Sequence, residues 1–136
     1  MQTQTHFAAG ILAYCPATKR FLLVQRSPRQ DHPLTWCGFG GGAEAGETPL
    51  ATATREFKEE TGYQGEFLRT YPLSVHQNGF HTWLGVLAQE FEPHDCWENF
   101  DSGWFALDQF PEPLHPGFRW TLGQSQFEKV KSTLGD

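Results

Sequence analysis

Residues 41–63 read GGAEAGETPLATATREFKEETGY and contain a helix whose two ends are both marked by residue type. Thr48 is a residue type that caps a helix N-terminus, and Pro49 is favoured at the first helical position. Gly62 is the residue expected just past a helix C-terminus. The segment therefore predicts a helix over Pro49–Thr61, entered from a glycine-dominated loop over Leu34–Glu47.

This helix would bring three carboxylates together beside the core. One stripe is apolar and is predicted to pack on a sheet: Leu50, Ala53 and Phe57. The neighbouring arc is acidic: Glu56, Glu59 and Glu60. Like charges repel at this spacing, and anions are unfavourable in the last turns of a helix, where the dipole is negative.

The acidic arc has two interpretations. Surface helices are often acidic, so the three carboxylates could form a solvated face. A bound divalent cation would instead remove both electrostatic objections, and a carboxylate-only set suits a hard ion such as Mg²⁺ or Mn²⁺. The glycine-rich segment immediately upstream favours the second interpretation, because such a loop allows close approach to a ligand.

A family resemblance is carried by the same residues. Gly41, Glu47 and the run Arg55–Tyr63 match every specified position of the Nudix box, so the chain resembles the Nudix hydrolases. Trp36–Phe39 and Trp104–Leu107 are similar to further family segments on either side of it. The resemblance implies an α/β fold, an α/β/α sandwich with a mixed central sheet. It also implies hydrolysis of a pyrophosphate linkage with Mg²⁺ or Mn²⁺.

The resemblance assigns roles residue by residue. Glu56, Glu59 and Glu60 would bind the metal together with the backbone carbonyl of Gly40, and Glu56 is the first candidate to activate water. Arg55 would hold these carboxylates, and Glu47 would brace the loop against the helix. Gly40 stands where many members have proline, and Ala43 where many have a basic residue. These departures bear on the rigidity of the loop and on one phosphate contact.

Other candidate residues lie outside the box. Glu98 either ligates a metal, orients the base or simply solubilises its loop. Arg26, which ends an apolar run, is a candidate for substrate binding, and Phe39 is a candidate for stacking on a base. Most aromatic residues are nevertheless expected in the core. His115, in a proline-rich loop, either closes over the substrate or fixes that loop.

The rest of the chain predicts a mixed sheet covered by helices. Short strands are expected over Phe7–Tyr14 and Phe21–Arg26. A hairpin is expected from Glu66–Val75 and Phe80–Phe91, because Asn-Gly lies between them. The remaining expected elements are a short strand at 104–105, a helical turn at 107–110 and a closing helix at 119–134.

Composition bounds the function. The 136 residues fit one domain over 1–136, and a net charge of -6 removes the general attraction to polynucleotides and anionic membranes. The three cysteines have no metal-binding spacing, and the apolar run Phe7–Tyr14 is too short for a membrane span. We therefore expect a cytoplasmic protein with no polynucleotide partner and no membrane attachment. The family resemblance adds the expectation of a homodimer.

Two functions of different classes remain. The first is a metal-dependent pyrophosphohydrolase acting on a nucleoside diphosphate linked to another group, with nucleotide sugars, ADP-ribose-like compounds and (d)NTPs all open as substrates. The second is a non-catalytic nucleotide-binding or sensor module with the same fold. Non-catalytic relatives typically lack one or more of the carboxylates, whereas Glu56, Glu59 and Glu60 are all present.

Overall fold

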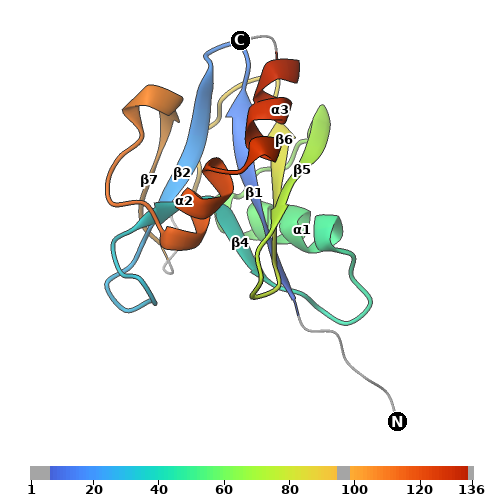
Figure 1. Ribbon diagram of the computed structural model, residues 1–136, viewed down its shortest axis with the longest axis vertical. Helices are drawn as coiled ribbons and strands as arrows, with labels where there is room; N and C mark the ends of the chain where they lie inside the picture. Colours follow the sequence, from blue (N-terminus) through green and yellow to red (C-terminus); the bar gives the residue numbers. More distant parts are fainter. Residues whose placement is uncertain (1–6, 95–98, 135–136) are drawn as a thin grey trace.

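The computed structural model describes residues 7–94 and 99–134 as a single mixed sheet with helices on both faces (Figure 1). Its strands are β1 (Ala8–Cys15), β2 (Arg20–Arg26), β3 (Trp36–Cys37), β4 (Phe39–Gly42), β5 (Arg69–Val75), β6 (Phe80–Val86) and β7 (Asn99–Ala106). Its helices are α1 (Pro49–Thr61), α2 (Pro116–Leu122) and α3 (Ser125–Thr133), with a 3₁₀ turn η1 (Leu107–Gln109).

Strand β1 is the centre of the sheet because three strands pair with it. Along one edge, its first half, from Ala8 to Ile11, pairs antiparallel with β4, and its end, from Ala13 to Cys15, pairs antiparallel with β2. Along its other edge it pairs in parallel with β6, which pairs antiparallel with β5. The sheet continues on the far side of β2 with β7. Mixed pairing of this kind confirms the α/β class.

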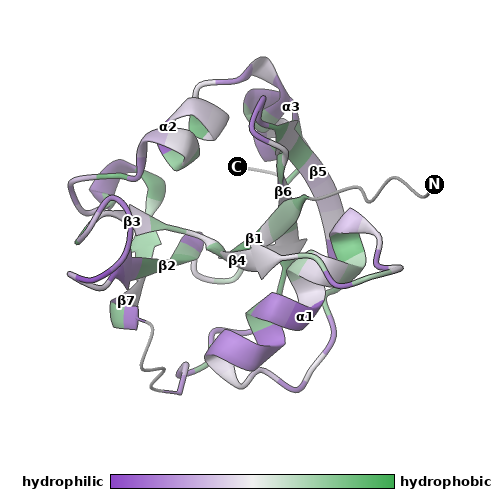
Figure 2. Cartoon of the chain, turned by 90° about the horizontal axis from the view of Figure 1, so that it is seen from below, coloured by the Kyte–Doolittle hydropathy of each residue, from purple (hydrophilic) through white to green (hydrophobic). Residues whose placement is uncertain are grey.

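The helices form two layers around the sheet. Figure 2 shows α1 on one side and both α2 and α3 on the other. Alternate residues of β1 follow this division, since Ile11 packs in the cluster with Phe57 of α1, and Leu12 packs in the cluster with Phe127 of α3. The expected α/β/α sandwich is confirmed.

Helix α1 begins and ends where the sequence predicts. The Thr48 hydroxyl accepts a hydrogen bond from the Ala51 amide, and Pro49 opens the helix. Gly62 adopts a left-handed conformation at φ 77°, and its amide donates to the Lys58 carbonyl. The carboxylates near the C-terminal end of α1 are thus fixed relative to the loop that precedes it.

The glycine segment differs from the expected loop. It forms β3 and β4, and at Gly38 and Gly40 its backbone approaches β1 so closely that a side chain would not fit. A Cβ at Gly38 would lie 2.6 Å from the Ile11 carbonyl oxygen, and one at Gly40 would lie 2.7 Å from the Ala9 carbonyl oxygen. Glycine therefore serves strand pairing here as well as loop freedom.

The C-terminal part also differs from the prediction. The single helix expected over 119–134 is two helices, because Gly123 interrupts it and α2 begins earlier, at Pro116. His115 makes this earlier start possible, since its Nδ1 accepts the Gly117 amide at 3.0 Å. The strand predicted at 104–105 is longer, because β7 pairs with the whole of β2.

The hairpin is confirmed with shorter strands than expected. β5 and β6 pair antiparallel on either side of the turn, and Gly79 has φ 89°. β6 ends at Val86, and the Leu87 amide that follows still donates to the Tyr14 carbonyl of β1 at 2.9 Å. None of the helices within 7–94 and 99–134 has the length and apolar character needed to cross a membrane.

Candidate active site

The Glu56 carboxylate lies directly against the backbone of Gly41. A Cβ at Gly41 would come closer than 3.0 Å to the Cδ and both oxygens of Glu56. The glycine is therefore required so that a carboxylate of α1 can rest against β4. At the next position, Gly42, a Cβ would have no described atom within 4 Å.

Arg55 links the acidic helix to the glycine segment. Its Nη1 donates to Glu56 at 3.0 Å and to Glu59 at 3.2 Å. Its Nη2 donates to the Gly42 carbonyl at 2.9 Å, and its Nε donates to Glu47 at 2.7 Å. These carboxylates raise the pKa of the guanidinium above its ordinary value. The fork of donors sets the positions of the carboxylates, which a lysine could not do in the same way.

Glu47 fixes the loop before α1. Its Oε1 accepts from the Glu44 amide at 2.8 Å and from the Thr52 hydroxyl at 2.7 Å. The hydrogen bond from Arg55, followed by those from Glu44 and Thr52, lowers the pKa of Glu47 to about 2. The carboxylate is therefore ionised at neutral pH, and its hydrogen bonds join the loop before α1 to Thr52 and Arg55 of the helix.

A polar hollow lies beside the C-terminal half of α1. Glu56 and Glu60 line it together with the backbone of Gly40, Gly41 and Gly42. Glu59 is not part of its wall, and its side chain is 58% exposed. Across residues 7–94 and 99–134, no three His, Cys, Asp or Glu side chains are already arranged to hold a metal ion.

The donor set nevertheless fits a hard cation. Carboxylates and a backbone carbonyl are the oxygen ligands that Mg²⁺ and Mn²⁺ accept, usually with several waters. Because Gly41 has no side chain, the Glu56 carboxylate can lie against its backbone and line the hollow. In this structure Arg55 supplies the positive charge that Glu56 and Glu59 face.

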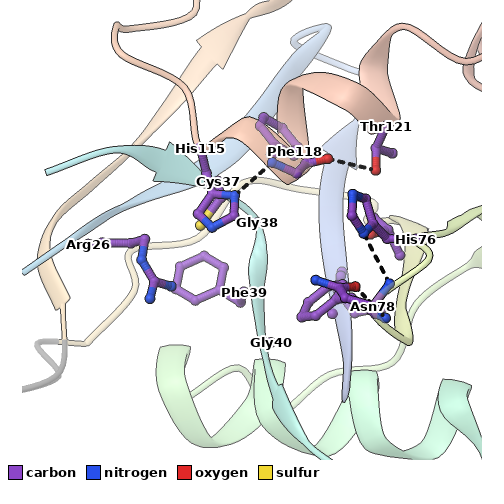
Figure 3. A pocket seen from close by; sticks show the side chains of 15 residues that line it. Arg26, Cys37, Gly38, Phe39, Gly40, His76, Asn78, His115, Phe118 and Thr121 are labelled. Atoms are coloured by element: carbon purple, nitrogen blue, oxygen red, sulfur yellow. Dashed lines mark hydrogen bonds between the residues drawn. The ribbon is translucent and has the colours of Figure 1, made fainter. Parts of the chain in front are cut away.

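A second cavity, of about 240 Å³, lies on the α2 side of the sheet (Figure 3). Its floor is Gly10, Gly38 and Gly40, where the sheet has no side chains, and Phe118 and Thr121 of α2 face them. The other side chains of its wall come from β2, β3, β4, the β5–β6 hairpin and the loop before α2: Arg26, Cys37, Phe39, His76, Asn78, Phe80, Thr82 and His115. The cavity therefore offers both apolar surface and hydrogen-bonding groups, as small-molecule sites do.

The hollow and the cavity meet at the same strands. Arg26, Cys37, Gly38 and Gly40 line both of them. The Arg26 Nε donates to the Asp31 carbonyl at 2.6 Å, which holds the guanidinium near this junction. One extended ligand could therefore occupy the cavity and reach the acidic hollow beside Arg26.

Burial shifts the pKa values of two ionisable groups in the cavity wall, Cys37 and His115. Desolvation raises the pKa of the Cys37 thiol to about 11, so the sulfur is a neutral thiol. Desolvation, followed by the charges of His32, Arg26 and His76, lowers the pKa of His115 to about 4. His115 is thus a neutral imidazole whose Nδ1 is already used as the cap of α2.

Phe39 and Glu98 differ from the other predicted site residues. Phe39 lines the cavity, but its side chain is 1% exposed and its ring packs edge-on against Phe57 at 5.5 Å. This ring belongs to the core beneath α1, so its proposed role in stacking stays a prediction. Glu98 lies outside the described residues, and its role likewise stays a prediction.

His76 and Asn78 are cavity residues that the sequence analysis did not single out as a site. The Asn-Gly pair predicts the hairpin but not its position, which depends on the parallel pairing of β6 with β1. That pairing brings the turn beside Gly10 and across from α2. The sequence does contain a signal for the face of β6, because its period-two pattern places Phe80 and Thr82 together on the α2 face.

Comparison with known proteins bears directly on this geometry. The family model for the NUDIX domain matches residues 4–123. The chain belongs to the Nudix family. A Mycobacterium tuberculosis protein named "Putative 8-oxo-dGTP diphosphatase 3" is 33% identical over 124 residues, which cover 82% of this chain and 57% of that protein. A Streptomyces rubellomurinus protein named CMP-5'-(N-acetyl-N-hydroxy-3-aminopropyl)phosphonate hydrolase is 31% identical over 121 residues, covering 85% and 59%.

Solved structures of Nudix hydrolases share the fold. RenU from M. smegmatis superposes with a TM-score of 0.77 at 26% identity, covering 94% of this chain and 86% of RenU. A MutT NUDIX hydrolase from Burkholderia pseudomallei has a TM-score of 0.68 at 29% identity, covering 90% and 98%. The chain spans 57% and 59% of the two curated relatives but nearly all of the Burkholderia structure.

Proposed function

We propose that this Nudix protein hydrolyses a pyrophosphate linkage in a nucleoside diphosphate derivative, with Mg²⁺ or Mn²⁺ as cofactor. The observation that carries the proposal is the junction of the acidic hollow with the cavity at Arg26 and Gly40. A nucleoside in the cavity would extend its phosphates across β4 to the carboxylates of α1. The names of the relatives, a diphosphatase and a nucleotide phosphonate hydrolase, favour the same class of substrate.

The metal would be held by Glu56, Glu59, Glu60 and the Gly40 carbonyl. Mg²⁺ bound there would neutralise phosphate charge and help to position the reacting groups, which is most of what phosphoryl transfer requires. Glu56 and Glu60 already line the hollow, whereas Glu59 lies at its exposed rim.

The chain's own groups supply the remaining steps. The Arg26 guanidinium at the junction would bind a phosphate oxygen, and Arg55 would keep Glu56 in position through its bond at 3.0 Å. Glu56 would accept the proton of the attacking water as the water oxygen bonds to phosphorus. The anhydride P–O bond then breaks, and the leaving phosphate departs with that electron pair. No Ser or Cys nucleophile is needed, in agreement with the neutral Cys37 thiol.

The group beyond the diphosphate is the open part of the substrate. Nucleotide sugars, ADP-ribose-like compounds and (d)NTPs all place a pyrophosphate next to a nucleoside, so all of them satisfy the cavity and the hollow. A cavity of about 240 Å³ is slightly below the usual range for ligand sites, so it would hold the base, with the rest of the substrate outside.

The test is turnover with Mg²⁺ across nucleotide sugars, ADP-ribose, dinucleoside polyphosphates and normal and oxidised (d)NTPs. Released phosphate is measured with and without an added phosphatase, which reveals monophosphate products. Glu59→Gln and Glu60→Gln should each lower kcat at least about a hundredfold without unfolding the protein. Glu66→Gln is the matched control, because that carboxylate is 86% exposed and pairs with Lys58 outside the hollow.

The outcomes separate the two candidate functions. Full activity in both Glu59→Gln and Glu60→Gln would refute the proposed chemistry. Nucleotide binding measured by calorimetry, with no product formed over hours, would establish the non-catalytic module instead.

A further inference from the structure

One wall of the cavity is the turn of the β5–β6 hairpin, where hydrogen bonds determine which side-chain atoms accept and which can donate. The Asn78 Oδ1 accepts a hydrogen bond from the Phe80 amide at 3.1 Å. This bond distinguishes the two ends of the side-chain amide, because an amide NH₂ cannot accept from a backbone N–H. The Asn78 NH₂ is therefore the end left to interact with a ligand, and Asn78 lines the cavity (Figure 3).

The Asn78 NH₂ donates to no protein acceptor within the described part of the chain, so it is available to a ligand. His76, two residues earlier, likewise has one ring nitrogen that accepts within the turn and one that can donate. Its Nδ1 accepts from the backbone N–H of Asn78 at 3.3 Å, which leaves Nε2 as the ring nitrogen that can donate. The turn thus presents donors on two cavity residues, His76 and Asn78.

The opposite wall is also rich in donors. His115 uses Nδ1 to accept from the Gly117 amide, which leaves the proton of the neutral ring on Nε2. Arg26 carries donors only. On the hairpin side, Thr82 of β6 carries a hydroxyl that can donate or accept. The named side chains therefore complement a ligand edge that presents oxygen acceptors.

An aromatic ring, that of Phe80, also lines the cavity next to the turn. The tip of the Phe80 ring, its Cζ, would be 3.1 Å from a Cβ at Gly10 and 2.9 Å from one at Gly40, so the absence of these side chains makes room for the ring. An aromatic ring at this position favours a planar ligand, because a flat base that stacks on the ring makes a large contact area with it. A base stacked on Phe80 would bring its edge to Asn78, two residues earlier in the same turn.

We propose that Asn78 is a specificity-determining residue, whose side-chain NH₂ selects bases that carry an exocyclic oxygen over bases that carry an exocyclic amine. This inference rests on the proposed nucleotide-hydrolase function and deepens it. A carbonyl oxygen accepts from the NH₂, whereas an amine would bring donor against donor and leave both unpaired. An unpaired polar group in a site is costly, so the two kinds of base are separated in affinity.

The decisive variant is Asn78→Asp. One carboxylate oxygen can still accept from the Phe80 amide, so the turn is retained, while the group that meets the base changes from donor to acceptor. Gln77→Glu is the matched control, because it adds the same charge one residue earlier, at an exposed side chain outside the cavity wall. Circular dichroism and thermal melting verify that both variants fold.

Matched nucleotides provide the measurement. ITP and ATP differ by oxygen or amine at one ring position, as do UTP and CTP, and kcat/KM is compared within each pair in the presence of Mg²⁺. The wild-type protein should prefer the oxo member at least about tenfold, the effect of one hydrogen bond. Asn78→Asp should lower that ratio at least about tenfold, and Gln77→Glu should leave it unchanged.

Binding of the corresponding monophosphates, IMP, AMP, UMP and CMP, distinguishes this inference from the proposed function. An oxo preference in Kd that Asn78→Asp removes supports the role of Asn78 even where no turnover occurs, and then only the hydrolase proposal fails. Turnover with an oxo-to-amino ratio equal in the wild type and Asn78→Asp overturns the role of Asn78 alone. Neither binding nor turnover on any of these nucleotides overturns the role of Asn78, and the hydrolase proposal fails with it only if the wider substrate panel is also silent.

Discussion

Replacing Gly41 by alanine should disable the site without unfolding the protein. A Cβ at this position would approach the Glu56 carboxylate to less than 3.0 Å, whereas ordinary contacts between carbon atoms are about 3.5–4.0 Å. The carboxylate must therefore retreat by roughly 1–1.5 Å. Because it is the end of a flexible side chain, this movement should change the free energy of unfolding by less than about 1 kcal/mol.

The expected effect on catalysis is much larger. A misplacement of about 1 Å can lower a rate about a hundredfold, or about 2.7 kcal/mol in the activation barrier. We expect kcat of Gly41→Ala to fall by this factor on whichever nucleotide the wild type cleaves, and the affinity for Mg²⁺ to weaken. Steady-state kinetics, calorimetric Mg²⁺ titration and urea unfolding measure the three quantities separately.

Gly42→Ala is the matched control for this experiment. It adds the same methyl group to the same strand, where no described atom lies within 4 Å of the new Cβ. Neither glycine is among those with a positive φ, so alanine is compatible with both backbones. The proposal that Glu56 needs a glycine at position 41 is wrong if Gly41→Ala retains at least half of the wild-type kcat. It is also wrong if Gly42→Ala lowers kcat as much as Gly41→Ala does.

Three further predictions concern stability. Phe57→Ala should lower the free energy of unfolding by about 3–5 kcal/mol in urea, because the ring is completely buried, whereas Leu68→Ala, 61% exposed in the wild type, should change it by less than about 0.5 kcal/mol. Thr48→Ala should cost about 1 kcal/mol by removing the cap of α1, and no change would mean that Thr48 does not cap the helix in solution. The pKa of His115 is lowered from 6.5 to about 4, so the unfolded chain binds more protons between these values and stability should fall as the pH falls through that window. His115→Asn, which can still cap α2, should flatten that part of the pH–stability curve; an unchanged slope would contradict the assignment.

Local signals in the sequence were sufficient for α1. The cap at Thr48, the proline after it and Gly62 define the helix through contacts within a few residues, and the structure reproduces all of them. The roles of Arg55 and Glu47 were assigned by the family resemblance. Their side chains are hydrogen-bonded because the helix fixes one and the loop turns the other toward it, and their part in catalysis stays a prediction.

Features that depend on distant pairing were not available in the same way. The cavity depends on the parallel pairing of β1 with β6, which brings the Asn78 turn opposite α2. No local pattern specifies which strand a hairpin will join, so this wall of the cavity could not be derived from the sequence. The break of the C-terminal helix has local causes, the cap at His115 and the end at Gly123, which the prediction of one continuous amphipathic helix did not use.

The glycine segment contained more information than its interpretation as a loop used. Considered as a strand, it alternates: Phe39 and Gly41 face α1, where one packs on Phe57 and the other leaves room for Glu56, whereas Gly40 faces Phe80 on the opposite side. A period of two therefore assigns the core ring and the carboxylate seat to one face, and the cavity floor to the other. This alternation argues that Phe39 anchors the strand rather than the substrate. The proposed nucleotide would then pass beside β4, where Gly40 lines both the cavity and the acidic hollow.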